Sequence, residues 1–412
     1  MSGVRALRTG LQVMAVASAA ATMPALAQDD DDIAPPRLPR PGYDYEGIQD
    51  GNTTILAEAD VRLDYASNIF LTSDNEQDDL RLLVSPSIAV TQQVSTGSIG
   101  AEVHGGFTRH LETERENSNT FGGSLAMGLS PTRGRQLQAL FAYDRSIERR
   151  GDPETQAGPT DPPQKIDLLL AETSYRQAIG DFRFGAELGA EKINLLDPAE
   201  DDRDLTSYRA SVRLGYNISP AFDVFLQPYV NSRDFRLPVD FSGVDRDANT
   251  YGLLVGVERE LGARLQGNFG VGIFRTDPED DVIPAYTGAS ASASITWQPR
   301  ARTAVNFRLE RGNVATVRSG ATTRVDTIAR LRLDQEIRHN LLGQVTVSYT
   351  DRYYLGSQQG HLRTGGAQVG LEYLLTRRFS VYTAATYQQR NALADIDEYD
   401  SFVFSIGLRS RL

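Results

Sequence analysis

Residues 400–412, the last of the chain, alternate between apolar and polar side chains. The apolar positions are Phe402, Phe404, Ile406, Leu408 and Leu412, and the residues between them include Ser405, Gly407, Arg409 and Arg411. Because successive side chains of an extended strand point to opposite faces, the pattern predicts a strand with one apolar face and one polar, cationic face. A terminal strand this apolar would be an aggregation-prone edge in a soluble sheet. We therefore expect it to close a barrel against the first strand of the chain.

The same alternation recurs from residue 53 onward. In the first strand Glu58, Asp60, Arg62 and Asp64 alternate with apolar residues, so the charged face must meet water and the other face must meet an apolar medium. We predict eighteen strands, an even number as closure of a single-chain bacterial barrel requires, with sixteen as the alternative. They span roughly 53–70, 79–94, 98–110, 119–130, 135–146, 166–178, 182–193, 205–218, 222–233, 249–260, 264–275, 286–298, 302–311, 324–337, 341–352, 363–375, 379–390 and 400–412.

The connections between these strands alternate between short turns and long loops. Short turns such as 179–181, 298–300 and 338–340 are followed by longer, often acidic segments such as 148–165 and 234–248. A soluble β-sandwich or β-helix has no reason to keep short turns at one end, whereas an outer-membrane barrel has short periplasmic turns and long external loops. The predicted fold class is therefore all-β, a transmembrane up-and-down antiparallel β-barrel of about 18 strands, with both termini in the periplasm.

The N-terminal region is predicted to precede the barrel. Residues 1–27 have the arginines, the apolar Ala-rich stretch and the A-x-A site of a secretory signal peptide. Residues 28–52 are acidic and Pro-rich and are expected to form a flexible periplasmic tail, which leaves 53–412 for the barrel. Cysteine is absent, which suits an oxidising periplasm, and the net charge of -12 argues against a nucleic-acid partner.

Several short stretches resemble one family of Gram-negative outer-membrane proteins. They are 64–70 at the end of the first strand, the acidic segment 74–79, 246–258, the turn 297–299 and 375–378 before the last hairpin. Their order along 53–412 is similar to that in the putative β-barrel porin 2 family. The resemblance implies an outer-membrane barrel, called a porin on architecture, with some members near exopolysaccharide synthesis and export. It brings no residue-level catalytic motif.

Few residues suggest catalysis or metal binding. His110, followed by Glu112 and Glu114 in a predicted external loop, could activate water or a serine, but a solvated loop is the better interpretation. No metal-ligand spacing is present, and the acidic run 279–281 is more typical of a solvated face. The sequence predicts no enzyme activity, no catalytic residue, no cofactor and no metal site.

Charged residues at inward positions are the candidate functional residues. Mixed opposite charges around a narrowing would filter polar solutes by size and charge, whereas pairing across neighbouring strands would merely hold the wall, and the sequence leaves both possibilities open. The candidates are Arg209, Arg213, Arg330, Arg332, Arg183, Arg308, Asp60, Arg62, Asp64, Glu187 and Glu310. The strongest candidates are two pairs of arginines on one inward face, Arg209 with Arg213, four positions apart, and Arg330 with Arg332, two positions apart, which would form short inward ladders.

The predicted function is passive passage of small polar solutes through a porin-like channel. The longest loop, 148–165, is the candidate constriction, although an exposed loop is more common. The alternatives are a component of exopolysaccharide export, which needs inward aromatic rings such as Phe225, Tyr229 and Phe274, and a closed structural barrel. Expected partners are outer-membrane lipid and lipopolysaccharide, and the barrel-assembly machinery through the terminal strand 402–412.

Overall fold

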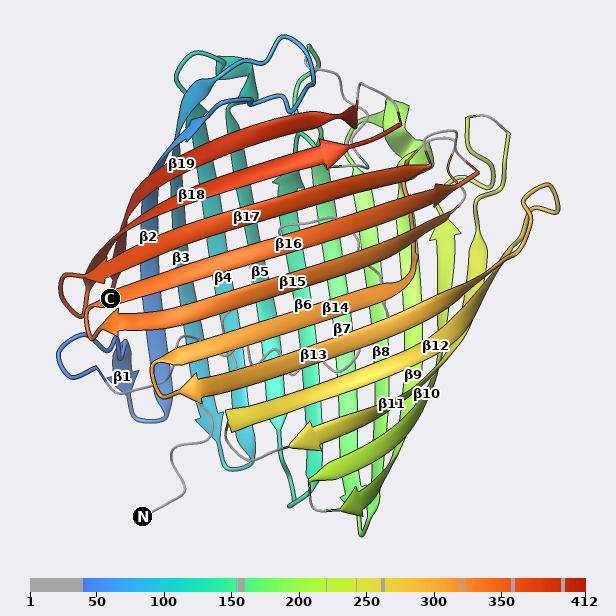
Figure 1. Ribbon diagram of the computed structural model, residues 1–412, viewed down its shortest axis with the longest axis horizontal. Coiled ribbons are helices and arrows are strands. Elements are labelled where there is room, and N and C mark those ends of the chain that lie inside the picture. Colours follow the sequence, from blue (N-terminus) through green and yellow to red (C-terminus); the bar gives the residue numbers. More distant parts are fainter. Residues whose placement is uncertain are drawn as a thin grey trace.

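A computed structural model describes residues 40–412, apart from 153, 155–159, 220, 242, 261–263, 319, 320, 322, 357–359 and 394–396. Eighteen long strands, β2 to β19, pair antiparallel with their neighbours in sequence, and the last strand, β19, pairs with β2 (Figure 1). This confirms the predicted all-β barrel of about 18 strands, and closure between the terminal and first strands. The predicted signal segment, 1–27, lies outside the described residues.

Most strand boundaries match those expected from the alternation. The largest difference is in the first strand, which was predicted to end at residue 70 and ends at Ala66. The strands are β1 (Ile48–Asp50), β2 (Thr53–Ala66), β3 (Asp79–Val94), β4 (Gly97–His110), β5 (Ser118–Leu129), β6 (Arg135–Ile147), β7 (Lys165–Ile179), β8 (Phe182–Leu195), β9 (Leu205–Ser219), β10 (Phe222–Phe235), β11 (Ala248–Glu260), β12 (Leu265–Pro278), β13 (Tyr286–Arg300), β14 (Thr303–Val314), β15 (Thr323–Arg338), β16 (Leu341–Leu355), β17 (His361–Leu374), β18 (Phe379–Asn391) and β19 (Tyr399–Arg411). In the part of the chain that the structure describes, the helices are two short 3-10 segments, η1 (Glu114–Glu116) and η2 (Pro198–Arg203). Over the described residues, no helix has the length and apolar character needed to cross a membrane.

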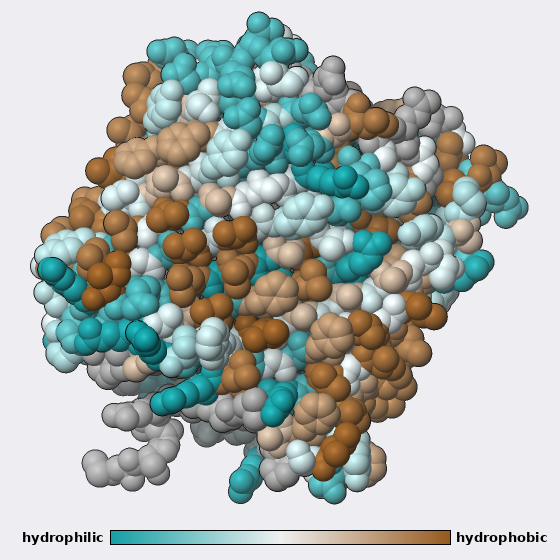
Figure 2. All heavy atoms as spheres, in the orientation of Figure 1, coloured by the Kyte–Doolittle hydropathy of each residue, from teal (hydrophilic) through white to brown (hydrophobic). Residues whose placement is uncertain are grey.

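The two faces of the barrel wall differ in polarity. On β2 the side chains of Val61, Leu63 and Tyr65 are exposed on the outer face, whereas Asp64 is buried on the inner face. Figure 2 shows apolar side chains across the middle of the visible wall and hydrophilic side chains towards its upper end. An apolar outer surface around a polar interior is the arrangement of a barrel that spans a membrane.

Short turns and long loops lie at opposite ends of the barrel. At the short-turn end, β7 and β8 are joined by residues 180–181, where Gly180 adopts a positive φ of 59°. At the long-loop end, the connection between β6 and β7 covers 148–164 and that between β10 and β11 covers 236–247. The predicted alternation of connection lengths is therefore present in the structure.

Residues 40–50, here called the N-terminal lead, contact the barrel at the short-turn end. Arg40 forms an ion pair with Glu336 of β15 at 3.4 Å, and β1 pairs with the start of β2. The hydroxyl of Tyr45 donates to the carbonyl of Leu412 and accepts from the N–H of Ala57 at 3.1 Å. The tail expected to stay flexible through residue 52 is thus held in its described part, because its side chains bond to backbone groups at the closing seam.

The ends of β14 and β15 at the long-loop end turn into the barrel. Pairing of β13 with β14 ends at Arg311, although β13 continues for five residues beyond Ala291 to Tyr286, while β14 and β15 stay paired up to Val314 and Arg324 (Figure 1). We call 312–326, without the undescribed 319, 320 and 322, the inward-folded segment. Its apolar residues pack against the inner wall of β9 to β12 in two clusters: Val325 with Tyr229, Leu254 and Phe274, and Ala315 and Val317 with Leu205 and Phe235.

Candidate solute pathway inside the barrel

The residues predicted to line the lumen occupy inner-face positions. They alternate along their strands with outward apolar residues such as Leu214 on β9 and Leu331 on β15, which are exposed on the outer surface. They are Arg183, Arg209, Arg213, Arg308, Arg330, Arg332, Asp60, Arg62, Asp64, Glu187 and Glu310. Their positions follow from the period of two, because one inward residue fixes the direction of every second residue on that strand.

The two predicted arginines of β9 are paired with carboxylates. Arg209 forms an ion pair with Glu172 of β7, and Arg213 forms one with Glu258 of β11 at 3.0 Å. The Arg213 guanidinium also lies 3.8 Å from the centre of the Phe225 ring. Both arginines therefore lie along the wall, with their charges offset by carboxylates two strands away.

The arginines of β15 differ from each other. Arg332 pairs with Asp334 at 2.9 Å, but among the described residues no carboxylate oxygen lies within 4.0 Å of Arg330, which is exposed. Arg330 is directly opposite Arg308 of β14, and Arg308 pairs with Glu310 at 3.2 Å. The middle of this wall therefore presents a cation to the lumen that its neighbours do not neutralise.

The other predicted residues also contact the wall around them. Those contacts join Arg62 to Asp64 at 2.9 Å, Asp60 to Arg409 at 3.3 Å, Glu187 to the Ser211 hydroxyl at 3.2 Å, and Arg183 to the backbone carbonyls of Gly180 and Phe182 at 2.9 and 3.3 Å. Pairing across the wall and display of charge to the lumen thus occur together in this barrel.

Three side-chain bridges on the inner wall pass over a glycine of the strand between them. They join His104 to Asp144 over Gly122, Arg209 to Glu172 over Gly189, and Tyr382 to Asp60 over Gly407. A Cβ at Gly189 would lie 2.5 Å from Nε of Arg209. Only a residue without a side chain lets the flanking strands make this contact. An inward glycine between strands bearing opposite charges was therefore a usable sequence signal that alternation alone misses.

Glu154, in the connection between β6 and β7, joins that loop to the inward-folded segment. Its carboxylate pairs with Arg324 and accepts bonds from the hydroxyls of Tyr354 (2.7 Å) and Thr316 (2.8 Å) and from the N–H groups of Val317 (2.7 Å) and Arg318 (3.1 Å). Burial alone would raise the pKa of Glu154, but the Arg324 guanidinium and these hydrogen bonds hold it at about 2. The carboxylate is therefore ionised and fully coordinated at neutral pH.

Three arginines make further contacts between the loops and the inward-folded segment. Arg246 donates to two of its backbone carbonyls, at 2.9 and 3.1 Å, and Arg203 donates to a third at 3.1 Å. Arg318, within the segment, binds both carboxylate oxygens of Asp397 in the loop after β18. Several loops are thus cross-linked around one segment.

The lumen is narrowed at the long-loop end. On β15, Arg324 and Asp326 have relative exposures of 1% and 0%, whereas Arg330, further towards the short-turn end, is exposed. The loop 148–165 was predicted as the constriction. Glu154 of that loop does enter the lumen, but it does so by binding the inward-folded segment, which the sequence did not single out.

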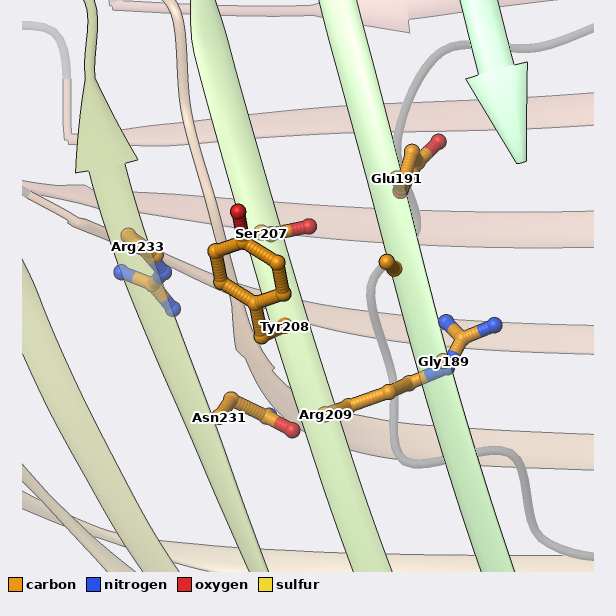
Figure 3. Close-up of a pocket in the computed structure, with 8 residues that line it drawn as sticks. Gly189, Glu191, Ser207, Tyr208, Arg209, Asn231 and Arg233 are labelled. Carbon is orange, nitrogen blue, oxygen red and sulfur yellow. The ribbon is translucent and has the colours of Figure 1, made fainter. Parts of the chain in front are cut away.

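A small pocket opens on the inner wall of β8, β9 and β10 (Figure 3). Two rows of paired positions form it: Glu191, Ser207 and Arg233, and below them Gly189, Arg209 and Asn231. Figure 3 shows Arg209 extending from β9 towards Gly189, with Asn231 and Arg233 coming from β10. Nη1 of Arg233 donates to the hydroxyl of Thr323, at 2.9 Å, so the pocket adjoins the inward-folded segment.

The family model described as Putative beta-barrel porin 2 matches residues 40–412. The chain belongs to this family. No curated protein matches the sequence. Among solved structures, the porin is similar to Pseudomonas aeruginosa OccK1 (OpdK), with a TM-score of 0.44 and 10% identity over 87% of this chain and 99% of that one. It is also similar to Pseudomonas aeruginosa OccK2 (OpdF), with a TM-score of 0.45 and 11% identity over 87% and 98%.

The three inward aromatic rings that the sequence offered as a sugar track do not face a passing solute. Phe225, Tyr229 and Phe274 are buried, with relative exposures of 6%, 6% and 1%. A Cβ at Gly256 would lie 2.4 Å from Phe225, and one at Gly252 would lie 2.1 Å from Tyr229. The rings therefore lie flat on glycines of the neighbouring strand, where they cannot stack on a sugar in the lumen.

His110 of the porin has a structural contact. Its Nδ1 lies 3.2 Å from the carboxylate of Asp79, which also accepts bonds from the N–H groups of Glu112 and Thr113 at 3.1 and 3.0 Å. The contact is with Asp79 rather than with the side chains of the acids that follow His110 in sequence. Within the described ranges the histidine thus takes part in ordering the start of a loop.

Three carboxylates lie close together at the long-loop end of β11 and β12. One oxygen of each of Asp245, Asp247 and Glu279 lies within 4.8 Å of the others, so together they offer the oxygen ligands that a divalent cation prefers. Burial, together with the neighbouring carboxylates Asp245, Asp234 and Glu279, raises the pKa of Asp247 to about 6. Glu279 belongs to the acidic run that the sequence suggested was only a solvated face.

Proposed function

We propose that this porin forms a passive channel for small polar solutes across the outer membrane. The observation that carries the proposal is the closed barrel whose outer face is apolar and whose inner face carries paired and exposed charges, such as Arg330. Water and polar solutes meet favourable partners inside such a barrel, and lipid meets them outside. An eighteen-stranded barrel is wide enough to leave an aqueous channel when its loops do not fill it.

The inward-folded segment would set the size limit of the channel. It is held against the wall of β9 to β12 by apolar packing and by Glu154, Arg203 and Arg246. Solutes would pass beside it and then enter the wider short-turn half. There the lumen is lined both by Arg330 and by ion-paired arginines such as Arg213, so the channel would discriminate only weakly between anionic and cationic solutes.

The proposed orientation places the short-turn end and both termini in the periplasm. Residues 1–27 would direct secretion and be removed, 28–52 would remain periplasmic, and 53–412 would form the membrane-embedded barrel. The long loops would then face the exterior, among lipopolysaccharide. The barrel-assembly machinery would recognise the apolar terminal strand, Phe402–Leu412, which closes the barrel on β2. We propose no catalytic role, because the contact of His110 with Asp79 accounts for that residue as part of a loop.

Liposome swelling tests this function. Purified, folded protein in liposomes should admit neutral sugars at rates that fall steeply from monosaccharide to trisaccharide, because diffusion through a narrowed lumen is limited by solute size. Protein whose barrel is shown folded by heat-modifiable gel mobility, but which admits no sugar, would contradict the proposal and support a closed structural barrel. Passage of long polysaccharide with exclusion of small sugars would favour the exopolysaccharide alternative, which the buried aromatic rings do not support.

A further inference from the structure

The N-terminal lead is attached to the barrel wall at two separate places. Near its end, the Tyr45 hydroxyl bonds to the backbone of Ala57 on β2 and of Leu412, next to β19. At its start, Arg40 forms an ion pair with Glu336 on β15, at 3.4 Å. The sheet order places β19, β18, β17 and β16 between β2 and β15 (Figure 1). The lead therefore joins parts of the short-turn mouth that are five strand positions apart.

Both ends of the lead contact the lumen side of the wall. Glu336 continues the inner positions of Arg332 and Asp334 on β15, and its relative exposure is 1%. Gly47 of the lead adopts a positive φ of 67°, and a Cβ there would lie 2.4 Å from Cδ2 of Leu56, an inner residue of β2. The lead is thus seated inside the rim of the barrel, where it can stand in the path of a solute.

The backbone of the lead is too short to follow the wall between these two contacts. Neighbouring strands lie about 4.8 Å apart, so five positions correspond to about 24 Å of wall. Residues 40–45 would cover about 20 Å if they were fully extended. They form a turn instead, in which the Arg40 carbonyl accepts bonds from the N–H groups of Tyr43 and Asp44, at 2.8 and 3.0 Å. The side chains of Arg40 and Tyr45 therefore complete the span, and the turn stands over the opening.

The Glu336 carboxylate holds the start of the lead by charge. Both of its oxygens are buried, and neither has a hydrogen-bond partner among the described residues. Its other cationic neighbours are Arg302, at 3.7 Å, and His339, at 3.1 Å, from two adjacent short turns. A buried carboxylate needs a counter-charge, and Arg302 still supplies one when Arg40 moves away. The ion pair with Arg40 can therefore break while the barrel itself stays intact.

We propose that the N-terminal lead acts as a strap across the short-turn mouth and, while Arg40 pairs with Glu336, narrows the exit of the channel. Breaking the ion pair lets the start of the lead leave the mouth, while β1 and Tyr45 keep its other end on the seam between β19 and β2. The inward-folded segment and the lead then restrict the lumen at opposite ends. This inference rests on the proposed channel function and adds to it a second determinant of the size limit.

Proteolysis of the folded protein in detergent micelles tests the attachment of the lead at Glu336. Chymotrypsin cleaves after tyrosine, and Tyr43 and Tyr45 lie in the lead. Cleavage there should be at least about tenfold faster in R40Q and in E336Q than in wild type, because each substitution removes one charge of the pair. R300Q is the matched control and should be cleaved like wild type. Arg300 is an exposed arginine at the same end, with no carboxylate oxygen within 4.0 Å among the described residues.

Planar-bilayer recording tests the narrowing itself. R40Q and E336Q should show a larger unitary conductance than wild type, or transitions to a larger level, whereas R300Q should not. Because the chain has no cysteine, a single thiol can be placed on the lead at the exposed Glu46. E46C should lose conductance when a bulky maleimide is attached, whereas R133C, on the short turn between β5 and β6, should keep it. Heat-modifiable gel mobility verifies that each barrel is folded.

The outcomes separate this inference from the channel proposal. If wild type conducts and R40Q has the conductance of R300Q, the strap is overturned and the channel function stands. Equal cleavage of the lead in R40Q, E336Q and R300Q would overturn the attachment at Glu336. Current in R40Q but none in wild type would support the strap and overturn the open passive channel. Folded barrels of wild type and R40Q that both give no current would overturn the channel and the narrowing together.

Discussion

Replacement of Glu154 by glutamine should release the inward-folded segment and widen the channel. The carboxylate neutralises Arg324 and accepts bonds from Tyr354 and from the backbone of Val317 and Arg318. Glutamine keeps the size of the side chain but has no charge, and only one of its two terminal atoms is an acceptor. The buried Arg324 guanidinium would keep Asp326 as its remaining partner.

The magnitude follows from the protonation equilibrium. The fall in the pKa of Glu154 from 4.5 to about 2 corresponds to about 3 kcal/mol of preference for the ionised group in the junction. Loss of that preference would lower the ratio of closed to released states about a hundredfold. Because the folded pKa is lowered, the stabilisation is complete above pH 4.5 and is lost as the pH falls towards 2.

Single-channel recording would measure the effect. E154Q should show a larger unitary conductance than wild type, or frequent transitions to a larger level, at pH 7. Wild-type conductance should stay constant from pH 7 to pH 5 and approach that of the variant only in stronger acid. E114Q is the matched control, because Glu114 is an exposed loop carboxylate and its loss should leave the conductance unchanged.

Equal conductance of E154Q and wild type would refute the reasoning, provided that the variant barrel is folded. That result would mean that apolar packing against Tyr229, Leu254 and Phe274 holds the segment without the junction. An increase of the same size in E114Q would also contradict it, because the effect would then come from loop charge in general.

Three further substitutions should change stability, each measured by urea unfolding of the barrel in lipid vesicles unless stated. Gly189→Ala should lower the free energy of unfolding by about 1–3 kcal/mol, because the new Cβ would lie 2.5 Å from Nε of Arg209; no change would refute the contact. Asp247→Asn should raise the free energy of unfolding by about 1 kcal/mol at pH 8 and leave it unchanged at pH 4. The pKa of Asp247 is raised to about 6, so the wild-type protein loses stability as the pH rises from 3.8 through 6, and solvent exposure reduces the size of this loss. An equal gain at both pH values would contradict this origin. Tyr45→Phe should detach the N-terminal lead by removing its bond to Leu412, worth about 1 kcal/mol, and speed its proteolysis; unchanged cleavage would argue against that bond.

The strands and the closure could be predicted because their signal is local. Each strand separates lipid from water, so every second residue must change character, and this holds without knowledge of the neighbouring strands. Asp64 and Leu63 on β2 show the rule, since one is buried inside and the other is exposed outside. The terminal strand was paired correctly with the first because an apolar last strand needs a partner and β2 supplies it.

The inward-folded segment could not be predicted in the same way, because its contacts join residues far apart in the chain. Glu154 meets Thr316 and Val317, more than 160 residues further along. A signal was present nonetheless. Val314, Ala315, Val317 and Ala321 put apolar side chains where an external loop would be polar, and all four are buried. Apolar composition in a connection on the long-loop side of a barrel therefore indicates a segment that folds inward.

The sequence predicted which face of the wall the candidate residues occupy, but not which partners they have. Alternation places Arg209, Arg213 and Arg330 on the inner face, but whether each is neutralised depends on strands two places away, which a single strand does not reveal. Arg233 drew no attention in the sequence, because an inward arginine near a strand end is ordinary. The Arg233 side chain is buried beneath the inward-folded segment, and this burial is a property of the assembled barrel.

The most direct test of the channel is the current through single wild-type barrels in a planar bilayer, with the reversal potential measured under a salt gradient. A continuous lumen that passes Arg330 and the paired charges of the wall predicts discrete conductance steps and a modest ion preference, whose sign reports the charge that dominates the narrowest part. Folded barrels that give no steps at any voltage would contradict a passive channel and would show that the cross-linked loops close the lumen completely.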